Sequence, residues 1–237
     1  MGGNDIPGII HDATTWVLPI LIAIPLHEAA HGYVAFLRGD RTAYMLGRVT
    51  FNPLKHIDPF GSLLLPALLW LTMGFPFGYA KPVPVDFRKL HNPKRDMVWV
   101  AAAGPGINFV LAIITGLLFH LVPLIPGGAQ VFVFKTLINS LQLNIGLALF
   151  NLLPLPPMDG GRIAVGILPR ALAMPLARVE RYGMLIILAV IFILPRLGQA
   201  MGVNLDILDW ILGPPYSYVL TGIARLTGIG GLIGLTG

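Results

Sequence analysis

Residues 18–37 read LPILIAIPLHEAAHGYVAFL, an apolar stretch with two histidines and one glutamate near its middle. A helix of this length can cross the hydrocarbon core of a bilayer. The HExxH pattern places His27 and His31 at positions i and i+4 on one helix face, where both can bind one zinc ion. Glu28, next to the first histidine, can then serve as a general base. The stretch therefore predicts a metal site inside a membrane span.

The composition of the whole chain agrees with a membrane protein. Its 237 residues are 55% hydrophobic and 11% charged, whereas soluble domains carry about 25% charged residues. We therefore expect an all-α polytopic membrane protein in contact with the lipid bilayer. The net charge of +5 does not indicate nucleic acid, because Lys and Arg accumulate on the cytoplasmic loops of membrane proteins.

Apolar runs predict five or six transmembrane helices joined by short interfacial β-hairpin or extended segments. The expected spans cover about 13–37, 60–75, 97–121, 130–152 and 179–195, with 205–225 as either a sixth span or an interfacial helix. We divide the chain into a core over 1–200 and a C-terminal part over 201–237 that ends in a Gly-rich tail.

Two connecting segments are predicted to be non-helical. Residues 44–51 are expected to form a short strand or hairpin. Residues 78–86 contain Pro82 and Pro84, which cannot both lie in a helix interior, so this part is expected to be extended.

Basic residues predict the orientation. Nine of the 16 Lys and Arg residues lie in the two segments that flank the second apolar run, which the positive-inside rule places in the cytoplasm. His27 precedes Arg38 by eleven residues, or about 16 Å of helix rise. The metal site is therefore expected within the bilayer, nearer its cytoplasmic face.

A third metal ligand is expected from the carboxylates. The chain has no cysteine, so a zinc site must use histidine, carboxylate or water. Of the 11 Asp and Glu residues, only Glu28 and Asp159 lie inside motifs at membrane depth. Two imidazoles and the Asp159 carboxylate would leave one coordination position open, as a catalytic zinc site requires. The alternative is that Asp159 is simply a turn residue, since Met-Asp-Gly-Gly is a common turn sequence.

The HEAAH motif and the later segment Asn151-x-x-Pro-x-Pro-Pro-x-Asp159-Gly160 together resemble the site-2 protease family of intramembrane zinc metalloproteases. Residues 52–59, 80–84 and 104–108 also resemble bacterial members, and no PDZ or CBS domain is visible. The resemblance implies Zn²⁺ as cofactor and hydrolysis of a peptide bond in or near the transmembrane helix of a single-span membrane protein. It also implies a location in the bacterial inner membrane.

Four further polar residues are candidates for contacts with the substrate or the oxyanion: Asn108, Asn144, Asn151 and His56. The alternative for Asn108 and Asn144 is amide hydrogen bonding between helices. Asn151 matches the family motif, where it would position the substrate or the aspartate loop. His56 is either a fourth metal contact or proton donor, or a residue of a polar interfacial loop.

Two other functions remain to be weighed. A metal or proton transporter also places His and Asp inside the membrane, but it is expected to spread polar groups over several spans. A catalytically silent membrane-protein binder would be expected to have lost part of the catalytic motifs. This chain retains all four residues, His27, Glu28, His31 and Asp159. The sequence indicates no oligomeric state.

Overall fold

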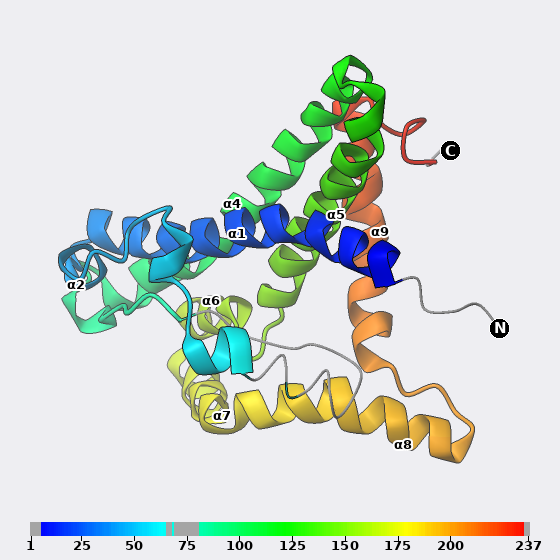
Figure 1. Cartoon of the computed structure of the whole chain (residues 1–237). Coiled ribbons are helices and arrows are strands. Elements are labelled where there is room, and N and C mark those ends of the chain that lie inside the picture. Colours follow the sequence, from blue (N-terminus) through cyan, green and yellow to red (C-terminus); the bar gives the residue numbers. More distant parts are fainter. Residues whose placement is uncertain (1–5, 65–67, 69–80, 235–237) are drawn as a thin grey trace.

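The computed structural model describes residues 6–64, 68 and 81–234, and these residues contain helices but no β-strand (Figure 1). The fold class predicted from the sequence, an all-α polytopic membrane protein, is confirmed. The α-helices are α1 (Ile6–Leu37), α2 (Thr42–Met45), α4 (Pro93–Leu118), α5 (Gly127–Asn151), α6 (Asp159–Ile167), α7 (Arg170–Leu188), α8 (Leu194–Met201) and α9 (Ile207–Thr227). Short 3₁₀ or π-helical turns are η1 (Pro53–Lys55), η2 (Pro59–Leu64), η3 (Phe87–Lys89), η4 (Phe119–Leu124) and η5 (Ala189–Ile193).

Four helical stretches among the described residues are long and apolar enough to cross a membrane. They cover His11–Leu37, Pro93–Leu124, Gly127–Asn151 and Arg170–Met201. These correspond to the first, third, fourth and fifth predicted spans. The second predicted span, 60–75, lies mostly outside the described residues, which include only η2 and residue 68 of it. The predicted segment 205–225 corresponds to helix α9, which begins and ends two residues later and is not one of the four stretches.

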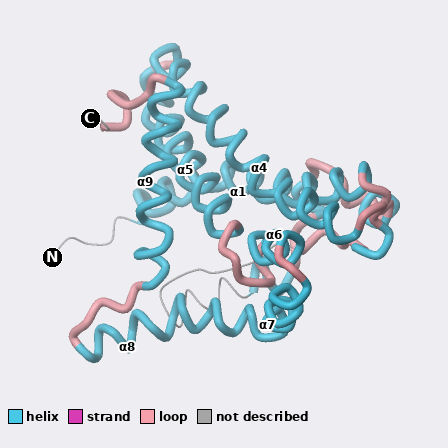
Figure 2. Tube along the Cα trace, turned by 180° about the vertical axis from the view of Figure 1, so that it is seen from behind, coloured by secondary structure: helices cyan, strands magenta, loops and turns pink. Residues whose placement is uncertain are grey.

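Helix α1 crosses both α4 and α5, while α9 runs beside α5 and contacts α4 (Figures 1 and 2). The main core lies where α4, α5 and α9 meet and includes Phe119, Leu141, Ile145 and Ile223. Ile229, in the Gly-rich tail, is completely buried in the same core. The division at residue 200 remains a prediction, although α9 and the start of the tail pack onto the rest of the chain.

The prediction of a strand or hairpin over 44–51 was wrong. The Asp40 carboxylate accepts hydrogen bonds from the backbone N–H and the hydroxyl of Thr42, an Asx turn that bends the chain where an extended strand was expected to begin. Helix α2 follows, and Gly47 then ends the turn with a positive φ of 63°. No neighbouring strand lies in the described chain to complete a hairpin.

Residues 81–86 are neither helical nor paired as a strand, in agreement with the predicted extended segment; residues 78–80 lie outside the described residues. Three backbone N–H groups of this segment donate to distant acceptors. Lys81 bonds the His56 carbonyl (2.9 Å), Val83 bonds the Glu28 carboxylate (2.8 Å) and Asp86 bonds the Asp40 carboxylate (2.7 Å). The segment is therefore held against α1, beside the HExxH motif.

Candidate metal centre

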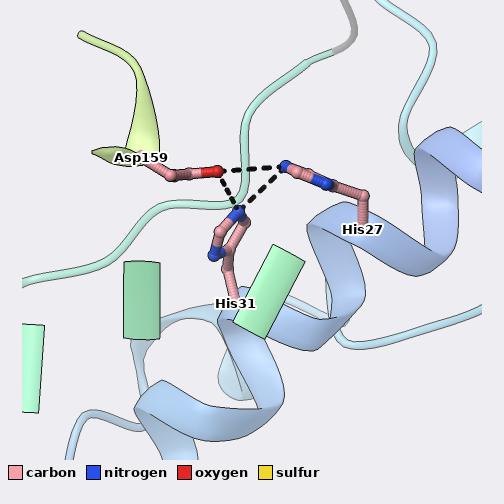
Figure 3. A group of neighbouring side chains, drawn as sticks. All are labelled: His27, His31 and Asp159. Carbon is pink, nitrogen blue, oxygen red and sulfur yellow. Dashed lines mark hydrogen bonds and ion pairs between the residues drawn. The ribbon is translucent and has the colours of Figure 1, made fainter. Parts of the chain in front are cut away.

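Three side chains from two distant parts of the chain converge at one point (Figure 3). His27 and His31 lie one turn apart on α1, and their Nε2 atoms are 3.1 Å from each other. Asp159 is the first residue of α6, and its Oδ2 lies 3.3 Å from each Nε2. The loop between α5 and α6 packs tightly against the start of α6, where a Cβ on Gly160 would overlap the Leu152 carbonyl. This packing helps to place the Asp159 carboxylate beside the histidines.

The hydrogen bonds of the two imidazole rings fix which nitrogen faces the centre. The Nδ1–H of His31 donates to the Val100 carbonyl at 2.7 Å. His27 Nδ1 lies 2.6 Å from Oδ1 of Asn108, which accepts its hydrogen. With hydrogen on each Nδ1, a neutral ring has only a lone pair on Nε2. Two nitrogen lone pairs and a carboxylate oxygen therefore face one another.

This arrangement fits a zinc ion. Tetrahedral zinc with bonds of about 2.0–2.2 Å to His nitrogen and carboxylate oxygen holds its ligand atoms about 3.3 Å apart. The three separations here are 3.1, 3.3 and 3.3 Å. Asp159 Oδ2 is also a buried oxygen that receives no hydrogen bond. The lone pairs on these three atoms repel one another, and a cation between them would attract all three.

Gly104 lets α4 approach the two histidines, a role that the sequence analysis did not identify although it noted the GPxxN stretch. A Cβ at this position would overlap Nε2 of His31 and would lie 2.6 Å from Nε2 of His27. Any other residue would therefore push α4 away or turn the rings out of position. The signal that could have found it is a glycine in the middle of a long apolar helix, where glycine is unfavourable without a packing reason.

Glu28 lies beside the metal ligands, and its Oε2 accepts the backbone N–H of Val83 at 2.8 Å. One carboxylate oxygen is thus fixed by the 81–86 segment, which orients the side chain. This contact could not be read from the sequence, because it joins residues 55 positions apart.

A cavity of about 360 Å³ opens beside the centre. Its wall includes Glu28, His31, Val83, Asn151, Asp159 and Arg162. Asn151 is therefore the one predicted substrate candidate that faces this cavity. Asn108 and Asn144 are buried behind His27, where their amides bond to each other at 2.9 Å.

His56 is not brought to the centre. It is buried in the loop after η1, where Nε2 lies 3.0 Å from the Thr50 carbonyl and the His56 carbonyl accepts from Lys81. It belongs neither to the candidate ligand group nor to the cavity wall. Its position favours the interfacial-loop interpretation, with a bond to the start of the 81–86 segment.

A His-His-carboxylate group beside a glutamate, set among membrane-length helices, is typical of a membrane-embedded zinc metalloprotease. Known proteins agree. The family described as Peptidase family M50 matches residues 127–194. The protein named "Putative zinc metalloprotease YwhC" of Bacillus subtilis is 40% identical over 185 residues, covering 76% of this chain and 80% of that relative.

Two mycobacterial proteins of the same description, both named Rip2, are similar as well. The one from Mycolicibacterium smegmatis is 31% identical over 182 residues, covering 76% of this chain and 66% of the relative. The one from Mycobacterium tuberculosis is 28% identical over 222 residues, covering 90% and 76%. No solved structure matches the chain. The chain belongs to the site-2 protease family and is a zinc metalloendopeptidase of that type.

Proposed function

We propose that this metalloprotease cleaves a peptide bond in or near the transmembrane helix of a single-span membrane protein, as in regulated intramembrane proteolysis. The main support for the proposal is that two of the proposed metal ligands lie within a membrane-length helix. His27 and His31 lie inside the apolar helical stretch His11–Leu37, and the adjoining cavity is lined in part by α4, a second span. The site is therefore placed to receive a peptide bond that lies in or next to a membrane-spanning helix.

His27, His31 and Asp159 are the residues proposed to hold zinc. When bound, zinc supplies a Lewis acid that acidifies water and polarises a carbonyl group. Glu28 is proposed as the general base and acid: it takes a proton from the attacking water and returns it to the leaving amine. The Val83 N–H donates to Oε2 of Glu28 and so orients the carboxylate, and Oε1 is proposed as the oxygen that exchanges the proton.

Asn151 is the proposed contact to the oxyanion or the substrate backbone. One hydrogen of its amide nitrogen bonds the Leu147 carbonyl of the same helix at 3.0 Å. The second amide hydrogen can donate into the cavity, whose wall Asn151 forms. Such a donor stabilises negative charge that develops on the substrate oxygen.

The location is proposed to be the bacterial inner membrane, with the active site toward the cytoplasm. Basic residues support this orientation, because Arg38 follows the ligands on α1 and a further cluster, including Arg88, Lys89, Lys94 and Arg95, lies before and at the start of α4. Arg38 also pairs with Asp96 at 3.4 Å, which brings the end of α1 and the start of α4 to the same side.

The test is a cleavage assay with purified protein and a single-span substrate, both in detergent and then in lipid vesicles. Mass spectrometry would locate the cut. We expect wild-type protein to cut within or next to the transmembrane segment and Glu28→Gln to make no cut. Cleavage restricted to a soluble tail, or equal cleavage of a soluble peptide that lacks the membrane segment, would refute the intramembrane assignment.

A further inference from the structure

A chain of two buried side-chain amides, which we call the amide relay, runs from His27 across α4 to α5. Asn108 Oδ1 lies 2.6 Å from His27 Nδ1, and Asn108 Nδ2 donates to Asn144 Oδ1 at 2.9 Å. Asn144 Nδ2 in turn donates to the Ser140 carbonyl at 2.8 Å. Both asparagines are almost completely buried, at 0% and 1% exposure, so water cannot replace these partners.

The Ser140 carbonyl determines which atoms donate and which accept along this chain of hydrogen bonds. A backbone carbonyl can only accept, so the Asn144 group facing Ser140 must be the NH₂. Asn144 therefore presents its oxygen to Asn108, and Asn108 must present its NH₂ to Asn144. That leaves the oxygen of Asn108 toward His27, which must then carry its hydrogen on Nδ1.

We propose that Asn108 and Asn144 are positioning residues that fix the Nδ1–H tautomer and the ring orientation of His27, so that its Nε2 lone pair faces the zinc position. His31 needs no such relay, because it bonds the Val100 carbonyl directly. The amide relay also links the ligands to one another: α5 carries Asn144 and leads directly into the loop that delivers Asp159. The inference rests on the zinc site and does not depend on the proposed substrate.

Helix-helix adhesion alone makes a different prediction. Hydrogen bonds between polar side chains on neighbouring membrane helices stabilise helix packing modestly. If the two amides served only to hold the helices together, it would not matter which amide atom of Asn108 faces His27. An apolar side chain of similar size at position 108 would then disturb the protein less than a buried carboxylate. A role in fixing the tautomer reverses that order, because an aspartate at position 108 keeps an oxygen that accepts from Nδ1–H and loses only the bond to Asn144, whereas a leucine loses both bonds.

The experiment compares zinc affinities of the purified full-length chain in detergent by competition with a chromophoric chelator. Loss of the outer hydrogen-bond partner of a metal-binding histidine typically costs 10- to 100-fold in metal affinity. We expect a loss of about that size for Asn108→Leu. Asn108→Asp should bind zinc at least about ten times more tightly than Asn108→Leu. The visible spectrum of the Co²⁺-loaded protein should change for Asn108→Leu and stay close to wild type for Asn108→Asp.

Asn144→Leu keeps Asn108 but removes the acceptor that orients it, so its zinc affinity should fall between those of wild type and Asn108→Leu. The matched control is Thr136→Val, which removes a buried α5 hydroxyl that bonds only the Phe132 carbonyl of its own helix. It should bind zinc like wild type. The proposal is overturned if Asn108→Asp binds zinc no better than Asn108→Leu, or if Asn144→Leu matches Thr136→Val. If Asn108→Leu fails to fold, the zinc affinity of Asn144→Leu is compared with that of Thr136→Val. A weaker affinity for Asn144→Leu supports the proposal, and equal affinities overturn it.

Discussion

Gly104→Ala should damage the metal centre although it adds one methyl group. The new Cβ would overlap Nε2 of His31 and lie 2.6 Å from Nε2 of His27. An ordinary contact needs about 3.5 Å, so α4 and the rings would have to separate by about 1 Å. The rings cannot simply turn away in the zinc-bound state, because their Nδ1 hydrogens are held by Asn108 and the Val100 carbonyl.

Overpacking by one methyl group typically costs about 1–3 kcal/mol. With zinc bound, the metal holds the rings in addition to these hydrogen bonds, whereas without zinc a ring can give up its Nδ1 hydrogen bond to relieve the overlap, so this cost falls mainly on the zinc-bound state. At 1.4 kcal/mol per factor of ten, zinc affinity should drop by about 5- to 150-fold. Cleavage at saturating zinc should also fall by about 100-fold, since a displacement of 1 Å in a reacting group has an effect of that order.

The assay is zinc competition on purified protein, followed by cleavage at saturating zinc. Gly106→Ala provides the control, because it lies on the same helix and its Cβ would meet no atom within 4 Å. It should match wild type in both measurements. If Gly104→Ala matched wild type as well, close packing of α4 on the histidines would not be what holds the site together.

Other perturbations separate the parts of the site. Glu28→Gln should retain about one zinc per chain while cleavage falls by about 100- to 10,000-fold, measured by metal analysis beside the cleavage assay; loss of zinc would instead make Glu28 a ligand. Asp159→Ala removes one of three ligands, so zinc content after dialysis should fall well below one per chain, and unchanged content would exclude Asp159 from the coordination shell. A zinc chelator should abolish cleavage and lower the unfolding temperature, both restored by added Zn²⁺, because an ion that binds only the folded state stabilises it; an unchanged melting curve would argue against a resident ion. Asp40→Ala leaves the N–H groups of Thr42 and Asp86 without their buried acceptor, at a cost of about 1–3 kcal/mol in unfolding free energy. It should lower cleavage through the 81–86 segment without changing zinc content, and equal loss of both would contradict this separation.

Local features of the site could be predicted from the sequence because they depend on local geometry. The i, i+4 spacing of His27 and His31 places both rings on one face of any helix that contains them. Asp159 was expected as the third ligand from zinc chemistry and from its place in a motif at membrane depth, without any geometric reason that it should meet the histidines, and the structure brings that carboxylate to them. The ligand role itself remains a prediction for the zinc measurements.

Contacts between distant segments could not be predicted in this way. The bond from Val83 to Glu28 and the close approach of Gly104 depend on how α1, α4 and the 81–86 segment pack. Asn108 and Asn144 were singled out as polar residues in apolar helices, but the atom that each presents depends on a third residue, Ser140. The strand predicted over 44–51 failed for a related reason, since the Asp40 side chain competes locally for the backbone and no partner strand is present in the described residues.

The most direct test of the metal site is the zinc content of the purified chain, measured by elemental analysis for wild type and His27→Ala prepared side by side without chelators. The account predicts about one zinc per chain in wild type and almost none in the variant, because the loss of one of the three proposed ligands breaks the site. A wild-type protein that purifies without zinc and binds none when it is supplied, or a variant that keeps a full equivalent, would contradict the assignment of the centre.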